Sequence, residues 1–248
     1  MSKQRHLVFG ATGGVGSALS RQLKEGGNEP VLIARNPAKL QSLAQDLGAP
    51  AHTIDCRNWE QVEALVARLS SEGEPIDGVA VCVGSLLLKP AHLTAQEDYE
   101  ATLETNLSVA FGILRAVVRP MMRAGGSIVF VSSAAARIGI ANHEAIAAAK
   151  AGLIGLMLSA AATYAGRGIR VNCVAPGLTE TPMTAGLTAN EAGRRASEAV
   201  HPMGRLGQPE EVARAIAWLL DRDQSWVTGQ TIGVDGGLGA ALSRRQSG

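Results

Sequence analysis

The sequence predicts a single α/β domain built on a doubly wound parallel sheet, and three observations carry that prediction. Short β-rich runs alternate with segments of helix length along nearly the whole chain, as in repeated βαβ units. Several of these runs are continuously apolar, which is typical of strands buried on both faces of a sheet. A glycine-rich turn follows the first run and opens a helical segment, where such sheets place a dinucleotide crevice.

Seven strands are predicted, each a run of β-branched, aliphatic or other small apolar residues between turn residues. They lie at 7–9, 31–33, 51–54, 79–83, 127–131, 169–174 and 231–234. Helices are predicted between them at 16–24, 59–69, 96–123, 145–165 and 209–220. Pro209 with two acidic residues after it forms a helical first turn, and Pro120 marks where the long helix bends or ends.

The domain organisation is simple. A chain of 248 residues is within reach of one large α/β domain, and no linker, repeat or low-complexity block interrupts residues 1–239. Residues 1–240 are therefore predicted to form one domain and residues 241–248 a flexible tail. The polar stretch 179–202 is expected to be a mobile flap rather than a core element.

Composition excludes several classes of protein. Hydrophobic residues at 46% exclude a disordered chain, and aromatics at 3% leave too few rings for a nucleic-acid stacking platform. With 23 Lys and Arg against 22 Asp and Glu, the net charge of +1 supplies no field toward phosphate backbones or anionic membranes. The expected partners are a small-molecule substrate and further copies of the chain, not nucleic acid.

The cysteine pattern and the apolar segments bear on location. Cys56, Cys82 and Cys173 are odd in number and show no C-x-x-C spacing, so neither a disulfide framework nor a metal site is predicted. The apolar run at 7–9 is too short for a signal peptide. The segment 145–165 contains Lys150 and many Ala and Gly, which favours a buried helix over a membrane span. A cytoplasmic location is expected.

The glycine turn is the first candidate binding site. It reads Gly10-Ala11-Thr12-Gly13-Gly14-Val15-Gly16 and leads directly into a helical run. Glycines allow a tight turn and close approach to a pyrophosphate, while free N–H groups at the helix start attract the anion. The alternative is a tight strand-to-helix connection that binds nothing.

The turn is one part of a longer resemblance. Further residues of the pattern follow in order along the chain: Asp55, Gly84, Asn106, Ser133, Lys150, Pro176-Gly177-Leu178-Thr179-Glu180-Thr181, His201-Pro202-Met203-Gly204-Arg205, Pro209-Glu210-Glu211 and Val234-Asp235-Gly236-Gly237. From end to end the chain resembles the short-type branch of the short-chain dehydrogenase/reductase family. This resemblance implies a Rossmann-like domain, a nicotinamide cofactor, alcohol–carbonyl redox chemistry and a homodimer or homotetramer.

The resemblance also implies roles for individual residues. Asp55 would bind the adenine amino group, Thr181 the carboxamide of the nicotinamide, and Lys150 the nicotinamide ribose. Ser133 would hydrogen-bond the substrate oxygen, and Asn106 would hold a water of the proton relay. The remaining cofactor positions that it implies are Gly10, Thr12, Gly14, Val15, Gly16, Cys56, Cys82, Gly84, Pro176 and Gly177.

The form of the cofactor follows from the end of the second strand. An acidic residue there would bind the ribose 2′-OH and repel a 2′-phosphate, but the chain has Arg35. Its planar charged fork suits a phosphate, and Lys39 offers a second charge. NADP(H) is therefore favoured over NAD(H). The alternative is that Arg35 is a solvated surface arginine.

The chain departs from the family pattern at the site of the chemistry. Where the family has tyrosine, four residues before Lys150, this sequence has Ile146, which has no exchangeable proton and cannot act as the acid or base. If the helix includes position 143, His143 shares a face with Ile146 and Lys150 and replaces the proton carrier. Glu144 is an alternative carrier, and a solvated His143 at the helix start is the alternative to a catalytic one.

Two hypotheses of function remain open. The first is an NADP(H)-dependent oxidoreductase that interconverts a hydroxyl and a carbonyl with an atypical site. The second is a non-catalytic NADP(H)-binding protein that serves as a cofactor sensor or a partner subunit.

Three further features of the sequence bear on the site and on assembly. Arg137 and Arg194 are candidates to bind an acidic substrate. The small residues Gly152, Gly155 and Ser159 on one helix suit contact between two subunits. A second departure lies at 81–83, where the family has two asparagines and an alanine.

Overall fold

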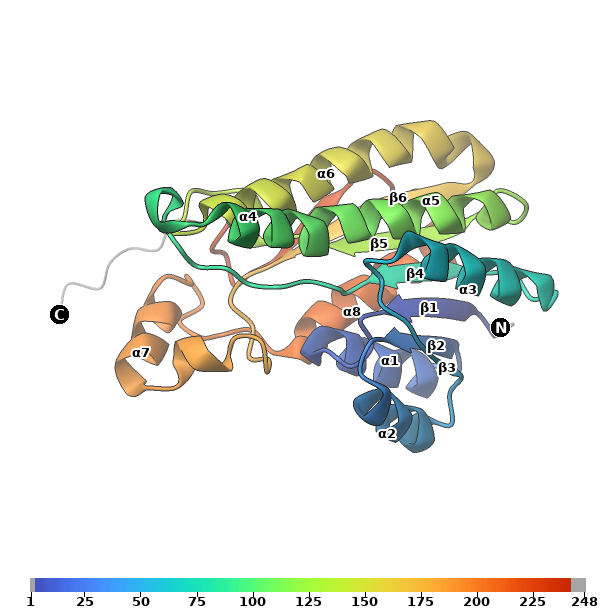
Figure 1. Ribbon diagram of the computed structural model, residues 1–248, viewed down its shortest axis with the longest axis horizontal. Helices are drawn as coiled ribbons and strands as arrows, with labels where there is room; N and C mark the ends of the chain where they lie inside the picture. Colours follow the sequence, from blue (N-terminus) through green and yellow to red (C-terminus); the bar gives the residue numbers. More distant parts are fainter. Residues whose placement is uncertain (1–2, 242–248) are drawn as a thin grey trace.

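The computed structural model describes residues 3–241 and contains one seven-stranded sheet. All neighbouring strands are parallel, and their order is β3-β2-β1-β4-β5-β6-β7 (Figure 1). The strands are β1 Arg5–Phe9, β2 Glu29–Ala34, β3 Ala51–Thr53, β4 Gly78–Val81, β5 Gly126–Val131, β6 Ile169–Pro176 and β7 Thr231–Val234. The predicted doubly wound parallel sheet is confirmed. The expected tail lies, apart from residue 241, outside the described residues.

Two layers of helices cover the sheet (Figure 1). One face carries α3 Trp59–Ser71, α5 Val109–Met121 and α6 Glu144–Tyr164, and the other carries α1 Gly14–Glu25, α2 Pro37–Leu47 and α8 Pro209–Leu220. Successive strand residues feed the two layers in turn, so that Leu7 and Phe9 join the first core and Val8 joins the second. This alternation explains the continuous apolar runs within the strands.

The helix α2 was not predicted. Asn36 caps it by accepting a hydrogen bond from the Lys39 N–H at 3.0 Å, Pro37 opens its first turn, and Gly48 ends it with φ +55°. Only Leu40 and Leu43 are buried along it, so its apolar stripe is too narrow to produce a helical pattern in the sequence.

The single long helix predicted at 96–123 consists of three segments. The helix α4 Gln96–Leu103 passes into a π-helical stretch, Glu104–Ser108, and then into α5, which ends one residue after Pro120. The π-helical stretch contains Asn106. Such bulges are frequent at functional sites, and this one lies at the site described below.

The segment expected to be an irregular flap contains helices. The short helix Ala185–Thr188 and α7 Glu191–Ala199 lie within it, and Asn190 caps α7. In Figure 1, α7 stands apart from the two helical layers, near the carboxyl ends of the strands. No residue of α7 is buried, so the segment lies outside the core as expected, although it is helical rather than irregular.

Two helical stretches, Gln96–Met121 and Glu144–Arg167, are long and apolar enough to cross a membrane by length and composition alone. In the fold they pack on the sheet, and α6 contributes Leu153 and Met157 to the core. The prediction of a buried helix at 145–165 is thus confirmed for the side of α6 that faces the sheet.

Candidate active site

The glycine turn lies where the order of the strands reverses, between β1 and β4. Gly10 has φ +83°, and a Cβ on it would lie 2.8 Å from the backbone carbonyl of Cys82, just beyond β4. A Cβ on Gly16 would overlap the Gly10 carbonyl oxygen. The chain can therefore make this turn only with glycine at both positions. The carboxyl edge of a sheet at such a switch point is where α/β domains bind ligands.

The start of α1 offers unpaired donors to an anion. Gly13 precedes the helix without a side-chain cap, and within residues 3–241 the N–H groups of Gly14, Val15 and Gly16 have no hydrogen-bond partner. A Cβ on Gly14 would lie 2.7 Å from the Thr181 methyl carbon. Free N–H groups, a helix N-terminus and space left by missing side chains together suit a dinucleotide pyrophosphate.

Basic side chains gather at the ends of β2 and β3. Arg35 follows β2, is exposed, and its side chain has no hydrogen bond or ion pair with any described residue. Beside it, Arg57 donates to the Asp55 carboxylate at 2.6 Å, and this bond, with a smaller contribution from the Arg35 charge, lowers the pKa of Asp55. Lys39 is exposed in the first turn of α2. Sequence reasoning missed Arg57, whose only signal was its place two residues after Asp55.

The cysteines of the crevice are protonated and unreactive at neutral pH. Burial raises the pKa of Cys56 and of Cys82 to about 12, so neither thiol forms a thiolate. The Cys82 N–H donates to the Phe9 carbonyl at 2.8 Å and thereby ties β4 to β1. Among the described residues, no group of three or more His, Cys, Asp or Glu side chains is placed to hold a metal ion.

Lys150, Asn106 and Gly84 converge at the same edge of the sheet. A Cβ on Gly84 would lie 3.1 Å from Asn106 Oδ1 and 3.4 Å from Lys150 Nζ, so both polar groups border the space above this glycine. The Asn106 amide is 1% exposed and donates to Thr102 O at 3.0 Å and Ser85 Oγ at 2.9 Å. These two hydrogen bonds fix the direction of the Asn106 side chain.

Lys150 is a buried amine. Its ammonium donates to the Val131 carbonyl at 2.9 Å and is 7% exposed. Burial lowers its pKa to about 8. Ser132, which sequence reasoning did not single out, donates to the Lys150 carbonyl at 2.8 Å and locks this turn of α6 to β5.

The lowered pKa of Lys150 predicts a pH dependence of stability. The unfolded ammonium has an ordinary pKa of 10.5, so above pH 8 the unfolded chain binds more protons than the folded chain, and the free energy of unfolding rises with pH. Between pH 7 and pH 9, the free energy of unfolding measured with urea should rise by about 1 kcal/mol more in wild type than in Lys150→Met. Lys39→Met, at an exposed site, should show the same gain as wild type; a Lys150→Met variant that also shows it would contradict the assignment.

Ser133 lies at the end of β5. Its hydroxyl accepts a hydrogen bond from the Ala135 N–H at 3.2 Å and so caps the short helix Ala134–Ala136. This is the ordinary role of a serine at a turn, and it leaves the hydroxyl proton free to donate to a substrate oxygen. Pro176 and Gly177 occupy the corresponding end of β6.

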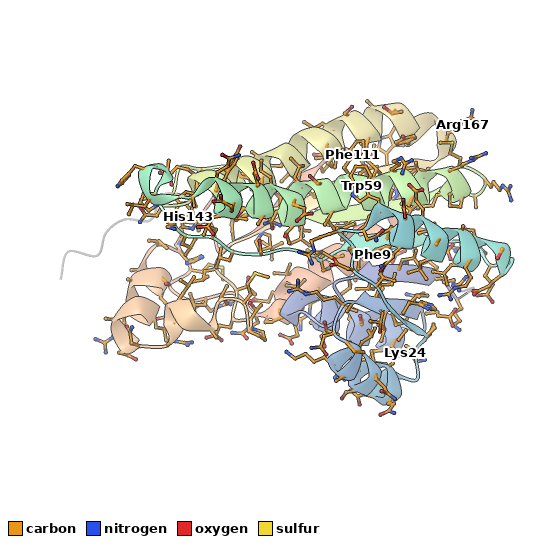
Figure 2. All side chains as sticks on the ribbon, in the orientation of Figure 1. Phe9, Lys24, Trp59, Phe111, His143 and Arg167 are labelled. Carbon is orange, nitrogen blue, oxygen red and sulfur yellow. The ribbon has the colours of Figure 1, made fainter. Side chains whose placement is uncertain are left out.

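The helix α6 begins at Glu144, so the condition for His143 to share a face with Ile146 and Lys150 is not met, and His143 lies at the helix start as in the alternative. His143 is the residue before the helix, and its Nδ1 contacts the Ala141 carbonyl at 2.7 Å. Figure 2 shows it at the opposite end of α6 from Arg167. Ile146 is 3% exposed, and Glu144 lines a cavity of 370 Å³ with Gln96 and Tyr99.

The two candidate cations for an acidic substrate differ in their surroundings. Arg194 is already engaged, because its guanidinium pairs with Glu180 and, at 3.1 Å, with Glu198. Arg137 is exposed and has no side-chain hydrogen bond or ion pair in the described part of the chain. Only Arg137 is therefore available without breaking an existing ion pair.

Comparison with known proteins identifies the family. Residues 10–239 match the family model described as enoyl-(acyl carrier protein) reductase. The chain is 36% identical over 238 residues to 3-oxoacyl-(acyl-carrier-protein) reductase of Vibrio cholerae, with 94% of this chain and 96% of the relative covered. It is 38% identical over 239 residues to carbonyl reductase family member 4 of Danio rerio, with the same shares covered.

Solved structures agree with the sequence comparison. A short-chain type dehydrogenase/reductase from Mycobacterium ulcerans superposes with a TM-score of 0.91 at 29% identity and covers 98% of this chain and 93% of its own. An actinorhodin polyketide ketoreductase variant solved with NADPH has a TM-score of 0.91 at 30% identity and covers 96% of this chain and 98% of its own. The chain therefore belongs to the short-chain dehydrogenase/reductase family of oxidoreductases.

Proposed function

We propose that this protein is an NADP(H)-dependent oxidoreductase that interconverts a hydroxyl and a carbonyl on a small or medium-sized substrate. The observation that carries the proposal is the convergence of Lys150, Asn106 and Gly84 beside the glycine turn. That arrangement combines a nucleotide-binding crevice with a buried cation at the carboxyl edge of the sheet, in a chain whose relatives are oxidoreductases.

Each part of the crevice has a task in this proposal. A bound nicotinamide cofactor supplies or accepts the hydride. The free N–H groups at the start of α1 hold the pyrophosphate, Arg35 holds the 2′-phosphate, and Asp55 binds the adenine amino group. Thr181 orients the carboxamide of the nicotinamide, and Lys150 binds the ribose hydroxyls. Ser133 donates a hydrogen bond to the substrate oxygen and so sets its distance from the transferred hydride.

The proton donor of this site is atypical. Ile146 stands where the family pattern has tyrosine, and an isoleucine side chain exchanges no proton. The remaining candidates are the Ser133 hydroxyl, the Lys150 ammonium, the His143 imidazole and, as its alternative, the Glu144 carboxyl group. Of the three N–H bonds of the ammonium, one is used on Val131, which leaves two for the ribose and the proton relay. A kcat that is unchanged in His143→Ala would remove the histidine from this role.

The cofactor preference is tested at Arg35. In Arg35→Ala the 2′-phosphate loses its charge-assisted hydrogen bonds, worth about 1.5–3 kcal/mol, so NADPH affinity should fall by about 10- to 150-fold while NADH affinity stays the same. Titration calorimetry with both dinucleotides measures this. Arg21→Ala, at an exposed arginine paired with Asp46 near the C-terminal end of α2, is the matched control and should change neither affinity. Failure of wild type to bind either dinucleotide would overturn the proposal.

A panel of ketones and alcohols tests the reaction itself, with the absorbance of the reduced nicotinamide as the readout. Turnover by the purified chain supports the enzyme. Binding of NADPH without turnover on any substrate of the panel supports the second candidate function, a non-catalytic NADP(H)-binding protein that acts as a cofactor sensor or partner subunit. The buried Ile146 is the specific observation that favours this second candidate.

We also propose a cytoplasmic homodimer or homotetramer that joins through α6. A Cβ on Gly155 would meet no atom within 4 Å, and Leu158 beside Ser159 is half exposed, so this face has room for a second helix. Gly152 is excluded from that face, because a Cβ on it would lie 2.9 Å from Leu107 within the same chain. A monomer mass in light scattering would remove this part of the proposal.

A further inference from the structure

His201 is a buried histidine that joins two segments on the substrate side of the sheet. It is 3% exposed. Its Nε2 accepts a hydrogen bond from the Leu178 N–H at 3.1 Å, and its Nδ1 lies 2.7 Å from the Ser197 carbonyl oxygen. Because an N–H can donate only to an unprotonated ring nitrogen, these contacts assign the proton to Nδ1 and make the ring neutral.

The segment that His201 holds leads to the dinucleotide crevice. A Cβ on Gly177 would lie 2.7 Å from His201 Nε2, so the end of β6 is shaped around the imidazole. Leu178 follows, and the next residue, Thr179, bridges to Gly207. Two residues further on, Thr181 packs against Gly14 of the glycine turn. A shift of the chain at Leu178 is therefore transmitted within three residues to the wall of the crevice.

On its other side His201 holds the flap. Ser197, whose carbonyl meets Nδ1, lies in the last turns of α7. Since no residue of α7 is buried, apolar packing contributes little to its position. Its polar attachments to the rest of the chain include the His201 contact and the ion pair from Arg194 to Glu180.

The charged groups around the imidazole are engaged elsewhere. Directly after β7, the Asp235 carboxylate accepts hydrogen bonds from the N–H groups of Gly237 and Gly239, both at 3.0 Å. The other charged neighbours form ion pairs with one another. Arg194 on α7 pairs with Glu198 on the same helix and with Glu180 in the segment after β6. Arg205 pairs with Glu211 in the first turn of α8. Among the described residues, no carboxylate forms a hydrogen bond or ion pair with His201, so no such contact favours a charged ring at this position.

We propose that His201 is a positioning residue whose neutral form holds the segment Leu178 to Thr181 in its dinucleotide-binding position, and that protonation of the ring releases this segment and α7 together. Protonated Nε2 carries a hydrogen and would face the Leu178 N–H, so two donors would oppose each other in a buried place. Acidification supplies the proton for this step, so lowering the pH is the test of the release. The expected loss of dinucleotide affinity rests on the proposed function. The release of the segment and of α7 does not.

Two substitutions at His201 separate the contact from its titration. In His201→Gln the amide can accept from Leu178 and donate to Ser197 but cannot titrate, whereas His201→Leu loses both bonds. Calorimetry at pH 7.5 and pH 5.5 should show wild-type NADPH affinity falling about 5- to 30-fold more than that of His201→Gln, the loss expected for one buried hydrogen bond. His201→Leu should bind weakly at both pH values. The 2′-phosphate of NADPH also changes its charge between these pH values. This change affects the affinity of wild type and of His201→Gln equally, so it cancels in the comparison of the two proteins.

Hydrogen exchange on the ligand-free protein tests the release without any cofactor. After correction for the intrinsic rate, protection of the Leu178 amide and of α7 should fall between pH 7.5 and pH 5.5 in wild type but not in His201→Gln. This difference in a protein that binds no dinucleotide would support the release while the proposed function fails. Unchanged protection of Leu178 in wild type at pH 5.5, a result that needs no variant, would overturn the inference, as would equal pH dependence in wild type and His201→Gln.

Discussion

Replacing Ile146 by tyrosine is expected to raise kcat for carbonyl reduction by ~10²–10⁴-fold, the usual contribution of a positioned general acid. Ile146 lies four residues before Lys150 on α6, so the two side chains point to the same face of the helix. The Lys150 ammonium would lower the pKa of a phenol placed beside it. The new hydroxyl would then supply the proton that isoleucine cannot, and initial rates with NADPH and a ketone measure the change.

The matched control is Ile146→Phe, which adds the ring without the hydroxyl. Ile146 is 3% exposed, so either ring must displace its neighbours, at a cost of about 1–3 kcal/mol in the free energy of unfolding. If the phenolic proton is what the site lacks, the tyrosine variant gains activity and the phenylalanine variant does not. Equal increases in kcat in both variants would show that the aromatic ring, and not its hydroxyl group, causes the change. A fast wild type that tyrosine does not improve would show that another group already donates the proton.

The sequence predicts the sheet well because each strand carries its own signal. Successive residues of β1 and β5, such as Leu7, Val8 and Phe9, are needed for one core or the other, and the resulting continuous apolar runs stand out between turn residues. The glycine turn is equally visible, because steric crowding at Gly10 and Gly16 leaves no other residue type possible. Features that depend on local sterics or on burial across a whole element are therefore readable from the chain alone.

Sequence reasoning did not predict the contacts that orient the side chains of Asn106 and His201, because the partners are distant in the chain. Asn106 is oriented by Ser85, 21 residues earlier, and the π-helical stretch around it has no apolar period of its own. His201 meets Leu178 at a separation of 23 residues. His143 is not part of α6, because the helix begins at Glu144, one residue before its predicted start at 145, and a residue that precedes a helix has no place on a helical face.

The second large effect is expected at Gly10, and the chain provides a matched control in Gly27. The two glycines have φ of +83° and +80°, so replacement by alanine costs each about 1–2 kcal/mol of left-handed strain. A Cβ on Gly27 meets nothing within 4 Å, whereas a Cβ on Gly10 lies 2.8 Å from the backbone of Cys82. Chemical denaturation should therefore give a further loss of about 1–3 kcal/mol in the free energy of unfolding for Gly10→Ala.

The difference between these two variants isolates the crowding at the crevice, because the backbone strain and the reduced freedom of the unfolded chain are common to both. The Cys82 backbone cannot rotate away as a side chain would, since its N–H is bound to Phe9, so relief requires β1 and β4 to separate at the edge where the dinucleotide is proposed to bind. Gly10→Ala should therefore also lose NADPH affinity in calorimetry, while Gly27→Ala retains it. Equal losses of stability in the two variants, with affinity intact in both, would mean that the crevice opens at little cost and that its close approach does not shape the binding site.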